Sequence, residues 1–104
     1  MRTSSPKDPG ETIAMAWNFA PDLVSGETLT GTPTTAIVQL TGAPDPSIGS
    51  MLVGSPQISG SDVVQTVTLG QASTNYAISA TCPTSTGRIL VNGGILPVVL
   101  AYQQ

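Results

Sequence analysis

The sequence contains no histidine and a single cysteine, and these shortages exclude most catalytic and metal-binding chemistry. Histidine is the commonest general base and the usual partner of a serine or cysteine nucleophile, so no catalytic triad is expected. A zinc site would need several Cys or His ligands, which this chain cannot supply. Cys82 has no cysteine with which to form an intrachain disulfide, and we expect it to be a small, buried strand residue.

Phosphate loops and paired catalytic carboxylates are also missing. The pair Gly93-Gly94 lies between apolar runs and has no following Lys-Ser or Lys-Thr, so we interpret it as a hairpin turn or bulge. The acids that could act as a glycosidase pair lie near turns, and Asp22, Glu27 and Asp45 are more simply explained as turn or solvating residues. We therefore expect no enzyme activity, no cofactor and no metal.

Charge is scarce: only 9% of residues are charged, against roughly 25% in an average soluble domain. All six acids lie in the first 62 residues, and Arg88 is the only charged side chain from Val63 onward. Such a surface suits permanent contact with other proteins, although a secreted, monomeric β domain rich in Ser and Thr is the alternative. The net charge of −3 and the lack of a basic run argue against direct nucleic-acid binding.

No segment has the form of a signal peptide or a membrane span. Residues 1–10 are polar, and the longest apolar tract, residues 89–101, is short and is interrupted by Asn92-Gly93-Gly94 and Pro97. We therefore expect a soluble protein made in the cytoplasm, with no membrane partner.

Two-residue alternation of apolar side chains recurs along the chain, whereas helical periodicity does not. Residues Ile13, Met15, Trp17 and Phe19 share one face of a predicted strand, and a later strand places its apolar residues in the same way, namely Tyr76, Ile78, Ala80 and Cys82. Further extended segments are predicted at residues 28–30, 34–41, 51–53, 57–58, 62–69, 89–91 and 95–102. The pattern predicts an all-β, antiparallel sandwich or barrel of about seven short strands.

Two aromatic residues sharpen this prediction. Tyr76 begins its strand just after a turn, where a tyrosine of an Ig-like sandwich can bond its hydroxyl back to that turn; an ordinary half-buried tyrosine is the alternative. Trp17 lies within an apolar alternating set and is predicted to anchor the core together with Tyr76 and Ile78. We predict an extended N-terminal arm at residues 1–11 and one Ig-like domain at residues 12–104.

Several segments together resemble the fibre-tail adaptor family of tailed phages, whose members are small Ig-like virion proteins. The resemblance covers most of the chain and lies in the following segments: Lys7-Asp8-Pro9-Gly10-Glu11, the strand around Trp17, Gly26-Glu27-Thr28-Leu29, Val64-Gln65-Thr66-Val67-Thr68-Leu69-Gly70, Tyr76-Ala77-Ile78-Ser79-Ala80 and Thr86-Gly87-Arg88. The chain departs from the family where Ala16 and Asn18 flank the tryptophan and where apolar residues follow Arg88.

The resemblance implies a virion structural protein that joins tail fibres or neighbouring virion proteins to the tail or neck, in several copies arranged by the symmetry of the particle. Its partners would be tail, neck or fibre subunits and copies of itself. We expect partner contacts from the arm and from the loop before the last strands, at residues Lys7, Asp8, Pro9, Glu11 and Arg88.

Two other functions are compatible with the sequence. One is a capsid decoration or cement protein, which would be present in far more copies than a tail adaptor. The other is a glycan- or receptor-binding domain in which Trp17, Tyr76 or Tyr102 stacks on a sugar, and this function requires an exposed aromatic ring in a groove.

Overall fold

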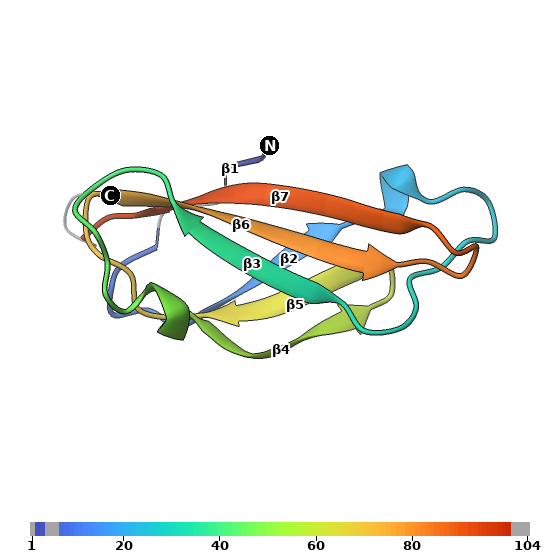
Figure 1. Cartoon of the computed structure of the whole chain (residues 1–104), viewed down its shortest axis with the longest axis horizontal. Coiled ribbons are helices and arrows are strands. Elements are labelled where there is room, and N and C mark those ends of the chain that lie inside the picture. The colour runs from blue at the N-terminus through green and yellow to red at the C-terminus, as the bar shows by residue number, and fades with distance from the viewer. Residues whose placement is uncertain (1, 4–6, 101–104) are drawn as a thin grey trace.

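In the described part of the chain, seven strands form two sheets that pack face to face (Figure 1). The structure, a computed structural model, describes residues 2–3 and 7–100. The strands are β1 (Arg2–Thr3), β2 (Ile13–Asn18), β3 (Thr34–Gln39), β4 (Leu52–Ser59), β5 (Asp62–Val67), β6 (Thr74–Pro83) and β7 (Ile89–Val98). Apart from the two-residue β1, which pairs with β7 in parallel, each sheet consists of three antiparallel strands, in the orders β7-β6-β3 and β2-β5-β4. The predicted all-β class is confirmed.

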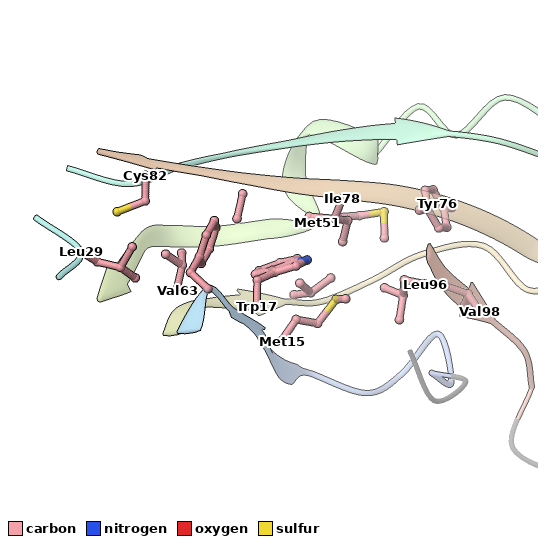
Figure 2. Packing of buried hydrophobic residues seen from close by; sticks show 13 residues of the cluster. Met15, Trp17, Leu29, Met51, Val63, Tyr76, Ile78, Cys82, Leu96 and Val98 are labelled. Atoms are coloured by element: carbon pink, nitrogen blue, oxygen red, sulfur yellow. The ribbon is translucent and has the colours of Figure 1, made fainter. Parts of the chain in front are cut away.

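The core lies between the two sheets and is built by the alternation seen in the sequence. Trp17 of β2 is 2% exposed, and Tyr76 and Ile78 of β6 are fully buried, so all three lie in the core. Figure 2 shows these side chains pointing into the same layer as Leu96 and Met51. The apolar residues that alternate with polar ones on β2 and β6 therefore account for how the two sheets hold together.

One polar residue, Gln65 of β5, is buried in this core and bridges the sheets. Its side-chain oxygen accepts a hydrogen bond from Thr35 Oγ1 of β3 at 2.8 Å, and its side-chain nitrogen donates to the carbonyl oxygen of Val53 at 2.9 Å. The second bond reaches the irregular part of the edge strand β4, whose pairing with β5 shifts between Val53 and Gln57. Gln65 thus satisfies a carbonyl group near the place where the ladder is interrupted.

The last strand has no turn at its glycines. We expected either one last strand or a pair of strands, with a turn or bulge at Gly93-Gly94, and β7 runs as one strand from Ile89 to Val98. Gly93 pairs with Ser79, and Gly94 pairs with both Ile78 and the first residue of β1. Pairing with β6, and for Gly94 also with β1, holds the glycines extended, which explains why their turn chemistry is not used.

The sandwich is elongated, with extents of 45 × 23 × 20 Å, so its loops gather at two ends. We call these the η1 end and the η2 end after their 3-10 turns, Ala20–Asp22 and Ile48–Ser50 (Figure 1). Residues 28–30, expected as a short strand, make only an isolated bridge from Leu29 to Thr84 at the η1 end. In the part of the chain that the structure describes, no helix is long and apolar enough to cross a membrane.

Candidate functional site

The η2 end is organised around the hydroxyl group of Tyr76. This hydroxyl accepts a hydrogen bond from the backbone N–H of Gln71 at 2.9 Å and donates one to Asp45 Oδ2 at 2.7 Å. The first bond is the predicted link from the tyrosine back to the preceding turn, and it is confirmed. Burial, and to a smaller extent the neighbouring Asp45 carboxylate, raises the pKa of Tyr76, so the hydroxyl keeps its proton and remains a donor.

Lys7 lies inside the η2 end and does not project from it. Its side chain is fully buried, and its Nζ donates to the carbonyl oxygens of Leu69 at 2.6 Å and Asp8 at 2.8 Å. The Lys7 backbone is held against β7 by bonds with Pro97 O at 2.9 Å and Val99 N at 2.8 Å. Burial lowers the pKa of Lys7. Because no surface of this side chain is accessible, Lys7 supports the end from within and does not face a partner.

The residues after Lys7 form a compact turn. The backbone N–H of Glu11 donates to Asp8 O at 2.9 Å, and the Glu11 carboxylate accepts from the Asp8 backbone N–H at 2.7 Å. Glu11 is exposed, whereas Pro9 lines a shallow cleft of about 300 Å³ together with residues 45–47 and 69–71. Four of the five predicted contact residues, Lys7, Asp8, Pro9 and Glu11, are therefore together at the η2 end. The predicted boundary between arm and domain at residue 11 stays a prediction.

Arg88 lies at the opposite end, where it is paired with a buried acid. The Glu27 side chain is buried and forms an ion pair with the Arg88 guanidinium, including a bond of 3.0 Å from Arg88 Nε to Glu27 Oε2. Glu27 Oε2 also accepts from the hydroxyl groups of Thr84, at 2.6 Å, and Thr86. These bonds, first of all those from Arg88, hold the pKa of Glu27 well below its usual range.

This cluster joins two loops that are far apart in the sequence. Arg88 Nη2 donates to the carbonyl oxygen of Asp22 at 2.8 Å, and the backbone N–H of Val24 donates to Glu27 Oε1 at 3.0 Å. The sequence-based interpretation missed the role of Glu27, which we had assigned to a turn or to solvation. The sequence gives only a weak indication of this ion pair, since Arg88 is the only cation in its half of the chain and needs an acidic partner.

The aromatic residues do not form a sugar-stacking platform in the described part of the chain. Trp17 and Tyr76 are buried in the core, and Tyr102 lies outside the described residues. The same described residues contain no group of three or more acids or cysteines close enough to hold a metal ion.

The chain is thus a small two-sheet β protein whose polar side chains hold its loops in place at the two ends. Residues 7–97 match the family described as "Podophage GP4 fiber-tail adaptor protein gp77", so the chain belongs to this family. It is a structural, non-enzymatic component of the podophage virion tail, where it links fibres to the tail and binds tail and fibre proteins. No curated protein and no solved structure gives a significant match.

Membership of this family decides between the functions that the sequence left open. The adaptor function and the virion location are confirmed, and the cement-protein alternative, which required a place on the capsid shell, is not supported.

Proposed function

We propose that the chain performs its adaptor role as a rigid Ig-like sandwich. If β2 to β7 are taken as strands B to G of an Ig domain, the orders β2-β5-β4 and β7-β6-β3 correspond to B-E-D and G-F-C. Tyr76 at the start of β6 then occupies the tyrosine-corner position on strand F, and its bond to Gln71 supports this assignment. The parallel pairing of β1 with β7 adds a short first strand beside G.

In this proposal the two ends of the sandwich bind different partners, one the tail and the other the fibre. The observation that carries it is the separation of the two hydrogen-bonded loop clusters along the 45 Å axis of the molecule. Asp8, Pro9 and Glu11 would contribute contacts at the η2 end, and Arg88 with the loop that it holds would contribute them at the η1 end. Loops that hydrogen bonds already hold in place lose little conformational entropy when they bind a partner, and this favours affinity.

Charge reversal at each end tests this assignment. Glu11→Lys alters the η2 end and Asp22→Lys alters the η1 end, and both acids are exposed. Gln57→Lys is the control, because Gln57 is exposed on β4 along the side of the sandwich. Binding of each variant to the cognate tail protein and to the cognate fibre protein is measured separately by biolayer interferometry.

We expect each end variant to lose about tenfold in affinity for one partner and to keep its affinity for the other, while the control binds both. If both end variants bind both partners like the unmodified chain, or if Gln57→Lys is as harmful as they are, the two-ended assignment is wrong.

We further propose that several copies associate with one another on the virion.

A further inference from the structure

The outer face of the β3-β6-β7 sheet carries exposed aliphatic side chains, with small polar residues of β6 between them, and no charge. We define this outer sheet face as the solvent-exposed side of the three strands, opposite the core residues of β6. Val38 and Leu40 lie on the β3 side towards the η2 end, with exposures of 57% and 49%, and Ile89 and Val91 lie on the β7 side towards the η1 end, with exposures of 68% and 65%. Strand pairing places Ala77 between Val38 and Ile95, and Thr81 next to Val91.

No described strand position on this face is occupied by Asp, Glu, Lys or Arg. Large aliphatic side chains that are about half exposed or more are costly to leave in water, since each returns free energy when it is covered. The face therefore has the properties of an interface core rather than of a free surface.

The distribution of charge indicates which partner can cover this face. Each end of the sandwich carries three acids and one base, namely Asp8, Glu11, Asp45 and Lys7 at the η2 end and Asp22, Glu27, Asp62 and Arg88 at the η1 end. Two copies that met through their ends would bring net negative charges together, which is unfavourable. Two copies that met through the outer sheet face would bury no charge.

We propose that the outer sheet face is the surface through which a second copy of this chain binds, sheet against sheet. This inference rests on the proposed association of several copies and names its surface. It also leaves both ends free for the tail and fibre contacts, because the face lies along the side of the elongated sandwich (Figure 1).

The size of the face sets the strength of this association. Three strands spaced by about 4.8 Å, with an average length of about 30 Å, give a face of roughly 400 Å² per copy. A stable protein pair usually buries about 800 Å² on each partner. The isolated chain should therefore be a weak, concentration-dependent dimer, and neighbouring copies on the virion should associate firmly because the tail and fibre raise their effective concentration.

Analytical ultracentrifugation of the full chain over a wide concentration range tests this proposal. Val91→Asp places a charge in the face, and Ile89→Asp is a second variant there. Val53→Asp is the matched control, because Val53 is 45% exposed and lies on β4 of the other sheet. Circular dichroism and the fluorescence of Trp17 establish that each variant is folded.

We expect the weight-average molar mass of the unmodified chain to rise with concentration towards that of a dimer. It should rise at least as strongly at high salt, because the contact is apolar. Val91→Asp and Ile89→Asp should weaken association by about tenfold or more, since they bury a charge, whereas Val53→Asp should behave like the unmodified chain.

Three results would overturn the inference: a chain that is monomeric throughout, a Val91→Asp variant that still associates normally, or a Val53→Asp variant that is equally defective. A folded Val91→Asp variant should keep its affinity for the tail and fibre proteins. If instead it loses one of these partners and still self-associates, the face belongs to that partner. The inference would then fail while the adaptor function stands.

Discussion

Replacement of Tyr76 by phenylalanine should destabilise the fold without altering its core, because it removes only the hydroxyl group. The Gln71 N–H would lose its acceptor at 2.9 Å, and the Asp45 carboxylate would lose a donor at 2.7 Å. A neutral hydrogen bond contributes about 1 kcal/mol and one to a charged group about 1.5–3 kcal/mol. Asp45 and Gln71 are themselves partly exposed, so water can partly replace both bonds, and we expect a loss of about 2 kcal/mol.

Urea unfolding followed by the fluorescence of Trp17 measures this loss directly, because this single tryptophan is buried in the native state. The midpoint should fall while the dependence of free energy on urea stays unchanged, since the surface exposed on unfolding is the same. The melting temperature should fall by about 10 °C for a domain of this size.

Two further variants test whether the lost hydrogen bonds of Tyr76 cause the loss of stability. Thr12→Val removes an exposed hydroxyl that bonds to Thr68 Oγ1, and it should change stability by less than about 0.5 kcal/mol. A double-mutant cycle of Tyr76→Phe with Asp45→Ala should give a coupling energy of about 1 kcal/mol or more. A Tyr76→Phe protein as stable as the unmodified chain, or a coupling energy near zero, would refute the organising role that we assign to this hydroxyl.

Three other changes have defined outcomes. Glu27→Gln should lower the melting temperature at pH 7 and flatten the dependence of stability on pH below about pH 4.5. The pKa of Glu27 is depressed in the folded protein, so its carboxylate stabilises the fold at pH values above its ordinary pKa, and this stability is lost as the pH falls below that value. Gly42→Ala should cost about 2 kcal/mol in urea unfolding, since φ is +90° and the new Cβ would lie 2.6 Å from a threonine hydroxyl, whereas Gly49→Ala, with open space around it, should be neutral. Deleting residues 1–11 should lower the melting temperature more than deleting residues 1–6, because only the longer deletion removes the buried lysine.

The strands that face both core and solvent were the most predictable part of the fold. Trp17 in β2 and Tyr76 and Ile78 in β6 alternate with small or polar residues, and this period of two determines which side is buried. β3 was less clear, because apolar residues occupy both of its faces. The structure buries part of Ile37 and leaves Val38 exposed, a choice that depends on the register with β6.

Apart from the bond between Tyr76 and the turn before it, the two end clusters could not be predicted, because they join residues distant in the sequence. Glu27 and Arg88 are 61 positions apart, and nothing in their local sequence indicates that they pair. Lys7 lies in a polar segment and was expected on the surface. Its burial depends on the carbonyl of Leu69, 62 positions away, and on the end of β7. Long-range contacts of this kind are set by the tertiary fold and not by local pattern.

The parallel arrangement of β1 and β7 has a mechanical consequence for a protein that links fibres to the tail. A force that pulls the first and last strands through their outer ends acts along both strands in opposite directions. The backbone bonds that join Lys7 to Pro97 and Val99 are then loaded in shear, so they must break together and not one after another. The pairing of these strands therefore resists a force that pulls β1 and β7 apart along their length.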